Sequence, residues 1–327
     1  MPDPVKTIRR ALREGREVSA REALALTPLL PASLRDIVEA ALAANVAAPS
    51  AAAPAPFACG ILNAKSGRCG EDCAFCAQSR YHECGTPVYP LVPEEAMLER
   101  ARILSEHGVR RMGIVTSGAA PSEREIDRIC AAARRIRDTF PIALCASLGM
   151  LDAAKARRLR EAGFTRYHHN LETARSFYPA ICSSHAYEGR IATLHAAREA
   201  GLELCSGGLF GMGESWEQRI ELAVTLRELD VDSIPVNFLM PVAGTRLGET
   251  RPLEAQEGLG IVALFRILHP GRDIVLCGGR GRTLGEWDRT AFPFGANGIM
   301  VGDYLTAKGN AFARDMELLD VLGVRHA

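Results

Sequence analysis

From residue 57 onward the chain alternates between short apolar runs and longer amphipathic stretches. The apolar runs are rich in strand-forming residues, and the longer stretches carry apolar positions at helical spacing. The predicted strands are 57–64, 109–117, 142–150, 164–172, 202–211, 233–240, 273–279 and 296–302. The main helices that follow them are 93–108, 122–140, 152–163, 187–201, 215–230, 254–270, 283–292 and 310–323. Eight strand-then-helix units over about 270 residues predict a parallel (β/α)8 TIM-type barrel, with an open doubly wound sheet as the alternative.

The part of the chain before the barrel has a different pattern. Residues 3–44 carry apolar positions at helical spacing, and residues 47–56 are almost entirely alanine and proline. Because proline does not sustain a helix, this run is predicted to be a linker. The predicted organisation is an N-terminal helical segment (1–46), the linker (47–56), and the barrel with a C-terminal helix (57–327). The first segment could serve dimerisation or cover the bottom of the barrel.

Composition narrows the class of protein. Lysine plus arginine equals aspartate plus glutamate at 39 each, so no net charge attracts nucleic acid or an anionic membrane. No run reaches the roughly 18–20 apolar residues of a membrane span, and the charged N-terminus has no apolar stretch of signal-peptide length. We therefore expect a cytoplasmic protein without nucleic-acid or membrane partners.

Three of the ten cysteines, Cys69, Cys73 and Cys76, lie in the loop after the first predicted strand. Clustered cysteines in a reducing compartment more often bind metal than form disulfides. A structural zinc site normally has four ligands, whereas three thiolates on a four-iron cluster leave one iron open for a small molecule. The spacing favours an iron–sulfur cluster over zinc or chance. In a barrel, this loop belongs to the catalytic face.

Four further cysteines lie on four different predicted strands, and three of them are near strand ends: Cys59, Cys145, Cys205 and Cys277. Any one of them could be a small buried side chain, the usual role of a free cysteine. Their repeated position along the strands favours the alternative, that all four belong to one common site. The remaining cysteines, Cys84, Cys130 and Cys182, show no such pattern and receive no role.

With these features in view, the chain resembles the biotin synthase family of radical S-adenosylmethionine (SAM) enzymes from about residue 57 to 325. The motifs that carry the resemblance are "SGRCGEDCAFCAQS", "YHHNLET", "CSGGLFGMGE", "PVNFLMPVAGT" and "IMVGDYLTAKGN". The resemblance implies a radical SAM sulfurtransferase that converts dethiobiotin to biotin. Cys69, Cys73 and Cys76 would hold a [4Fe–4S] cluster whose open iron binds SAM. Reductive cleavage of SAM would give a radical that takes hydrogen from dethiobiotin, and an auxiliary cluster would donate the sulfur.

The resemblance also implies roles for individual residues. Glu172 would bond the SAM ribose, Asn170 would contact SAM and substrate, and Asn237 would hold the ureido ring of dethiobiotin. Thr306 would help to anchor the substrate carboxylate. Close backbone approach to SAM would fall to Gly207, Gly208, Gly211 and Gly213. The implied partners are an electron donor such as flavodoxin or ferredoxin, cluster-assembly proteins and a second copy of the chain in a homodimer.

The chain departs from the family pattern at the auxiliary cluster. Better-known members hold a [2Fe–2S] cluster with three cysteines and an arginine, and Cys145, Cys205 and Arg280 match three of these ligands. The cysteine expected on the second strand is absent, with Met112 or Gly113 in its place.

Two additional thiols, Cys59 and Cys277, stand where those enzymes have serines. Because four thiolates suit a four-iron cluster, we expect Cys59, Cys145, Cys205 and Cys277 to hold a four-iron auxiliary cluster. Arg280 would then tune that cluster without binding it. The alternative is a degenerate two-iron site in which Cys59 and Cys277 take no part.

Two other functions remain open from the sequence. A related radical SAM enzyme with another small substrate would share the barrel and the cysteine loop. A carrier that stores or delivers an iron–sulfur cluster would need neither a SAM pocket nor buried amides.

Overall fold

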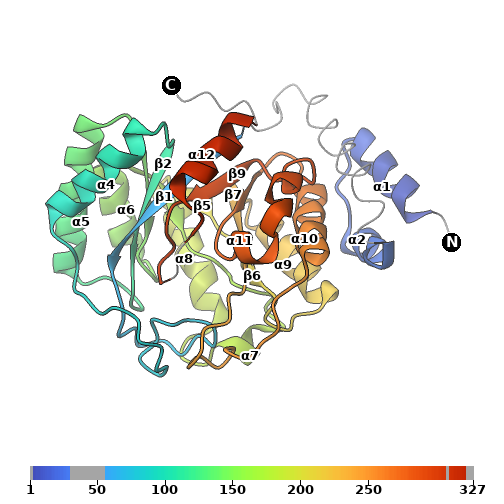
Figure 1. Ribbon diagram of the computed structural model, residues 1–327, viewed down its shortest axis with the longest axis horizontal. Helices are drawn as coiled ribbons and strands as arrows, with labels where there is room; N and C mark the ends of the chain where they lie inside the picture. The colour runs from blue at the N-terminus through green and yellow to red at the C-terminus, as the bar shows by residue number, and fades with distance from the viewer. Residues whose placement is uncertain (1–2, 30–55, 307–308, 322–327) are drawn as a thin grey trace.

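A computed structural model describes residues 3–29, 56–306 and 309–321, and its centre is one parallel sheet (Figure 1). Its strands are β1 (Phe57–Lys65), β2 (Arg111–Thr116), β3 (Ala143–Ser147), β4 (Phe164–His168), β5 (Glu203–Cys205), β6 (Gly208–Phe210), β7 (Ser233–Phe238), β8 (Asp273–Leu276) and β9 (Gly298–Val301). Neighbouring strands pair in the order β5-β4-β3-β2-β1-β9-β8-β7-β6, and β5 also pairs with β7. The short β5 and β6 thus share one position between β4 and β7. The sheet closes into an eight-position parallel barrel, so the predicted (β/α)8 fold is confirmed and the open sheet is not.

Helices connect successive strands and surround the barrel (Figure 1). They are α4 (Glu94–Glu106), α5 (Glu123–Thr139), α6 (Ala153–Ala162), α7 (Tyr178–Ile181), α8 (Tyr187–Glu199), α9 (Trp216–Glu228), α10 (Ala255–Leu268), α11 (Arg280–Thr283) and α12 (Phe312–Val321). Local sequence sets where several begin. Ser122 and Glu125 form a reciprocal capping box at the start of α5, and Ser215 and Gln218 do the same for α9.

Alternation along the strands separates side chains that face the helices from side chains that face the barrel interior. On β2, Met112 and Ile114 are fully buried toward the helices, whereas Arg111, Gly113 and Val115 line an interior cavity. This follows from the two-residue period of a strand. The sequence placed either Met112 or Gly113 at the position of the absent cysteine, and only Gly113 faces the interior.

The N-terminal helices α1 (Pro4–Arg13) and α2 (Ala20–Leu26) lie beside α9 and α10 (Figure 1). A 3-10 turn, η1 (Thr27–Leu29), follows α2. Arg227 of α9 donates a hydrogen bond to the carbonyl of Val18 at 2.8 Å. The rest of the predicted helical segment, residues 30–46, and nearly all of the predicted linker lie outside the described residues. No helix among the described residues is long and apolar enough to cross a membrane.

Two predicted elements differ from the structure. The predicted strand 202–211 is interrupted between β5 and β6, because Gly207 approaches β7 so closely that a Cβ there would lie 2.0 Å from the Pro235 carbonyl oxygen. The predicted helix 283–292 is instead a 3-10 helix, η2 (Gly285–Ala291), preceded by the single turn of α11. Gly285 has a φ of +54°, which ends α11 before a longer helix can form.

Candidate active site

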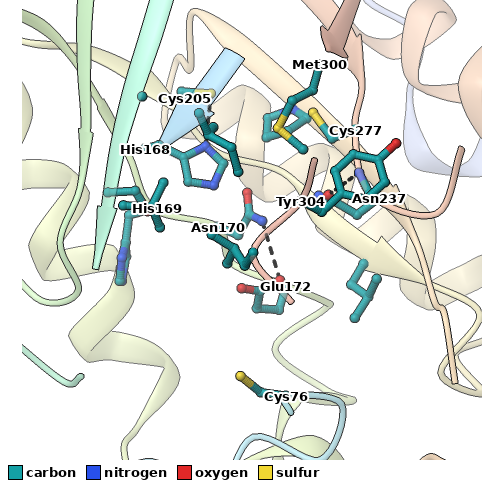
Figure 2. Close-up of a pocket in the computed structure, with 18 of the residues that line it drawn as sticks. Cys76, His168, His169, Asn170, Glu172, Cys205, Asn237, Cys277, Met300 and Tyr304 are labelled. Atoms are coloured by element: carbon teal, nitrogen blue, oxygen red, sulfur yellow. Dashed lines mark hydrogen bonds between the residues drawn. The ribbon is translucent and has the colours of Figure 1, made fainter. Parts of the chain in front are cut away.

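The barrel interior contains one large cavity of about 440 Å³. Its lining includes all seven cysteines predicted to have a role: Cys59, Cys69, Cys73, Cys76, Cys145, Cys205 and Cys277. In the view of Figure 2, Cys76 lies at one end, Cys205 and Cys277 at the other, and Asn170 and Glu172 between them. The structure thus brings the two predicted cysteine sets to a single space.

The cysteine loop, residues 66–79, is closed by its own backbone. The Cys69 amide donates to the Gln78 carbonyl at 2.9 Å, and the Cys76 amide donates to the Cys73 carbonyl at 3.0 Å. The Gln78 side chain accepts a hydrogen bond from the Gly67 amide at 3.1 Å. These bonds fix the loop so that its three thiols face the same cavity, as a shared metal centre requires.

Burial raises the pKa of Cys76 to about 11. The pKa of Cys73 is also raised, first by a hydrogen bond with Cys182 and then by burial. A metal ion reverses this effect, because a coordinating thiol gives up its proton to bind. The set therefore suits a cationic iron centre better than a free nucleophile.

The second cysteine set comes from β1, β3, β5 and the residue after β8. Burial raises the pKa of Cys59 and of Cys145 to about 12, and charge on Cys205 adds to the effect at both. Burial also raises the pKa of Cys277, with further contributions from Cys59 and Cys205. This mutual influence shows four thiols gathered in one buried place.

Cys205 differs from the other three. Burial acts to raise its pKa, but His168 and Arg166 outweigh burial and lower it. His168 Nδ1 lies 3.2 Å from Cys205 Sγ (Figure 2). His168, the last residue of β4, is thus the partner of Cys205.

Arginine and carboxylate side chains lie near the second cysteine set, where Arg111 is in register with Cys59 and Arg166 with Cys145. Arg111 of β2 and Arg166 of β4 both contact Glu203 of β5, at 3.2 and 2.8 Å. Arg166 also lies 3.6 Å from Asp273 of β8. Both arginines line the cavity, and both lower the pKa of Cys59 and Cys145. Sequence reasoning missed them, although strand alternation from Cys59 and Cys145 could have pointed to them.

The polar residues predicted to bind SAM and substrate are held by backbone groups. Asn170 Oδ1 accepts from the Gly207 amide at 3.1 Å, and its Nδ2 lies 3.5 Å from Glu172 Oε2. Glu172 has a φ of +69°, which turns the chain directly after β4. Asn237 accepts from the Gly278 amide at 2.9 Å and donates to the Gly208 carbonyl at 3.2 Å. All three side chains line the cavity.

The other residues predicted to contact SAM or substrate differ in whether they line the cavity. Thr306 lines the cavity, next to Tyr304 and Leu305. Gly207, Gly208, Gly211 and Gly213, all within the described residues, do not line it. A Cβ on Gly208 would lie 2.9 Å from the Glu172 carbonyl oxygen, so this glycine permits close packing of the segment that carries Glu172. The glycines shape the cavity wall through the backbone.

Arg280 lies outside the cavity lining. Its guanidinium is fully buried and contacts Asp315 of α12 at 2.7 Å and Asp288 at 3.3 Å. Gly279, with a φ of +77°, turns the chain after β8 so that Arg280 points toward α12. The position of this arginine indicates that it anchors the C-terminal helix.

We therefore expect Arg280→Met to lower the free energy of unfolding by about 3–5 kcal/mol, because it leaves the buried Asp315 without its counter-charge and Asp288 with Arg314 alone, 3.9 Å away. Exposed Arg282 provides the control, and Arg282→Met should change stability by less than about 0.5 kcal/mol. Urea unfolding measures both variants. Equal stability of the two would show that Arg280 has no anchoring role.

The spacing of the sulfurs bears on the kind of metal centre. Among the seven cysteines, all of them described, no three sulfur atoms lie within 4.8 Å of one another. A tetrahedral zinc ion holds thiolates about 3.8 Å apart, given a Zn–S distance of about 2.3 Å. The sulfur atoms of both sets thus lie further apart than the ligands of a single zinc ion. The ligands of a polynuclear cluster would be spaced in this way.

The sequence pattern of the Radical SAM superfamily matches residues 64–226, and that of the Biotin and Thiamin Synthesis associated domain matches residues 235–325. Together with the closed barrel and the three-cysteine loop after β1, the first match defines the chain as a radical SAM enzyme. A curated relative from Nitratidesulfovibrio vulgaris (strain DSM 19637 / Miyazaki F), named biotin synthase, is 55% identical and is aligned over 94% of this chain and 86% of its own length. A biotin synthase from Trichlorobacter lovleyi is 47% identical over 98% of this chain and 96% of its own length. The chain therefore belongs to the biotin synthase family.

Solved structures with lower identity share the fold. Methylornithine synthase (PylB) is 19% identical, with a TM-score of 0.79 over 98% of this chain and 97% of its own. The FeFe-hydrogenase maturase HydG from Carboxydothermus hydrogenoformans is 17% identical, with a TM-score of 0.80 over 98% of this chain and 78% of its own. These similarities support the barrel architecture alone.

Proposed function

We propose that this chain converts dethiobiotin to biotin, with sulfur taken from an auxiliary four-iron cluster held by cysteine alone. The observation that carries the proposal is that the two cysteine sets line one cavity, with the polar side chains of Asn170 and Glu172 between them. A reaction in which a radical from one centre and sulfur from another meet on a single substrate needs this arrangement. Membership of the biotin synthase family supports it.

Cys69, Cys73 and Cys76 would hold the first cluster. When bound, this [4Fe–4S] cluster and SAM supply the electron and the 5′-deoxyadenosyl radical that acid–base chemistry on side chains cannot provide. Asn170 and Glu172 would orient SAM above the loop, because both side chains line the cavity and Gly207 bonds the Asn170 side chain and the Glu172 backbone amide. The barrel walls exclude water from the space around them.

Cys59, Cys145, Cys205 and Cys277 would hold the auxiliary cluster. Four thiolates complete the coordination of a four-iron cluster without an arginine ligand. The position of Arg280 outside the cavity supports this choice over a two-iron site that uses Arg280. Arg111 and Arg166 would offset the negative charge of such a cluster together with Arg280, whose charge acts to lower the pKa of Cys277.

Asn237 would hold the ureido ring of the substrate, since its amide lies in the lining between the two cysteine sets. We expect Asn237→Asp to raise the KM for dethiobiotin about tenfold to a hundredfold. An aspartate can still accept from the Gly278 amide but no longer donates to a ureido carbonyl or to Gly208, and an unpaired buried polar group costs about 1–3 kcal/mol. Steady-state kinetics with varied dethiobiotin measure the change.

The KM for SAM provides the internal control for this variant, because Asn237 makes no hydrogen bond to Asn170 or Glu172. It should stay unchanged. An unaltered KM for dethiobiotin would contradict the proposed role.

Anaerobic turnover tests the whole proposal. Reconstituted protein is incubated with SAM, a strong reductant and dethiobiotin, and the products are followed by mass spectrometry. Biotin together with 5′-deoxyadenosine is the expected result. Deoxyadenosine without biotin would point to another substrate, and neither product from cluster-loaded protein would contradict the enzymatic assignment.

Several expectations stay predictions. They are the flavodoxin or ferredoxin donor, the cluster-assembly partners, the homodimer, the cytoplasmic location and a contact between Thr306 and the substrate carboxylate. Thr306 lies in the lining, which supports the last of them.

A further inference from the structure

Cys182, which has no role in the proposed reaction, lies beside Cys73, which has one. Cys182 Sγ is 3.9 Å from Cys73 Sγ. Cys73 belongs to the loop after β1 and lines the cavity, whereas Cys182 follows α7 and does not line it. Both side chains are buried, with exposures of 9% and 4%.

The segments that carry these two thiols are bound together on both sides of the sulfur contact. The Ala74 amide donates to the Ile181 carbonyl at 2.8 Å. Arg246 donates to the carbonyls of Asp72 and Ile181, at 2.8 and 3.0 Å, and so joins the two segments from outside.

Carboxylates of the cysteine loop add further bonds. Asp72 accepts from the amides of Ser183 and Ser184 at 2.9 and 3.0 Å. Glu71 Oε2 lies 2.5 Å from His185 Nδ1. The closeness of the two sulfurs is therefore a built feature of the fold, held by groups from four residues that flank Cys182 on both sides.

The polar surroundings of Cys182 also suit a reactive thiol. Its Sγ lies 3.3 Å from Asp72 Oδ1, 3.4 Å from His185 Nδ1 and 3.5 Å from Ser184 Oγ. Cys130 on α5 is buried too, but its Sγ contacts a backbone carbonyl, that of Arg158 at 3.7 Å, instead of three polar side chains.

We propose that Cys73 and Cys182 form a reversible disulfide that controls whether Cys73 is free to bind iron. The oxidant is a low-molecular-weight disulfide that enters through the cavity. Cys73, which lines the cavity, passes its proton to the Cys182 sulfur that it contacts and attacks the small disulfide, so that a mixed disulfide forms and one small thiol leaves. Cys182 then attacks the sulfur of Cys73, the second small thiol leaves, and the protein carries one new S–S bond.

The protein loses two electrons and two protons in this exchange, and the small disulfide takes them up as two thiols. Rotation of the two side chains has to bring the sulfurs from 3.9 Å to about 2.05 Å. A sulfur in a disulfide does not bind iron, so oxidation would block cluster loading until a dithiol reductant restores Cys73. This consequence rests on the proposed function, whereas the disulfide itself does not.

Peptide mapping tests the disulfide directly. The full chain, stripped of iron by a chelator and reduced, is treated anaerobically with glutathione disulfide, blocked with a thiol reagent and digested with trypsin. Cleavage after arginine gives peptides 69–80 and 176–190, and the second contains Cys182 as its one cysteine. We expect these peptides to be joined through Cys73, as fragment spectra will show.

Variants sharpen this test. Cys182→Ser should abolish the joined peptide, and the control Cys130→Ser should leave it unchanged. The proposal would be overturned if the unmodified chain gave no joined peptide, or if the link ran through Cys69 or Cys76 instead of Cys73. Neither outcome depends on a variant.

Iron loading tests the consequence. Oxidised chain should take up about four fewer iron atoms than reduced chain, the content of one cubane, and a dithiol reductant should restore the difference. A joined peptide with undiminished iron uptake would support the disulfide and contradict Cys73 as a cluster ligand. The two failures are thus distinguishable.

Discussion

Replacing Cys76 with alanine is expected to abolish formation of both 5′-deoxyadenosine and biotin. Cys76 faces the cavity from a loop that its own backbone closes, and its amide is bonded within that loop, so removal of the thiol takes away a ligand without loosening the fold. Two remaining thiolates do not hold a four-iron cluster at an open site. Product formation, followed by mass spectrometry, should fall to the level of a protein-free mixture, and iron content should fall by about four atoms per chain.

Cys84 gives the matched control for this variant. It lies eight residues further along, is partly buried and does not line the cavity. Cys84→Ala should retain both products and the full iron content. If Cys76→Ala still cleaved SAM, the assignment of the three-cysteine loop would be wrong.

Replacing Cys277 with serine is expected to separate the two halves of the reaction. The variant should still cleave SAM, because the three-cysteine loop at the other end of the cavity is untouched, but it should form no biotin. A buried serine hydroxyl keeps its proton and is a poor iron ligand compared with a thiolate. Iron analysis should show a fall from about eight to about four atoms per chain, with a matching loss of sulfide.

The same variant can disprove the auxiliary site. If the second cluster assembled normally in Cys277→Ser and still gave up its sulfur, Cys277 would not be a ligand. A two-iron site that uses Cys145 and Cys205 would then replace the four-iron proposal.

The barrel could be predicted because its signals are local. Each strand is a short apolar run and each helix repeats its apolar positions, so β2 and α5 can be identified without any knowledge of their neighbours. The break between β5 and β6 could not be predicted, because it arises from the approach of Gly207 to Pro235 on another strand. The turn that replaces the helix at 283–292 depends on the left-handed backbone of Gly285, which apolar spacing does not reveal.

Some residues of the candidate site could likewise be predicted from the sequence, and others could not. The seven cysteines could be identified by their positions in the first loop and along the strands, and the structure places all of them in one cavity. The contacts of Arg280 could not be predicted, because Gly279 turns it toward Asp315, which is far away in the sequence. The contact of Arg111 and Arg166 with Glu203 could not be predicted from the sequence, because it joins three separate strands. Cys182 gave no signal, since its nearness to Cys73 spans more than a hundred residues.

The ion pairs that join Arg111, Arg166, Glu203 and Asp273 cross the barrel at the ends where their strands begin. Charged pairs packed at that end leave the opposite end, with the three-cysteine loop, as the route for anything that enters or leaves. Iron and sulfide that renew the auxiliary site would then have to pass through the space that SAM and dethiobiotin occupy during a turnover. We expect renewal of the sulfur source to begin only after the product has left, so that each chain alternates between a synthetic phase and a refilling phase and cannot perform both at once.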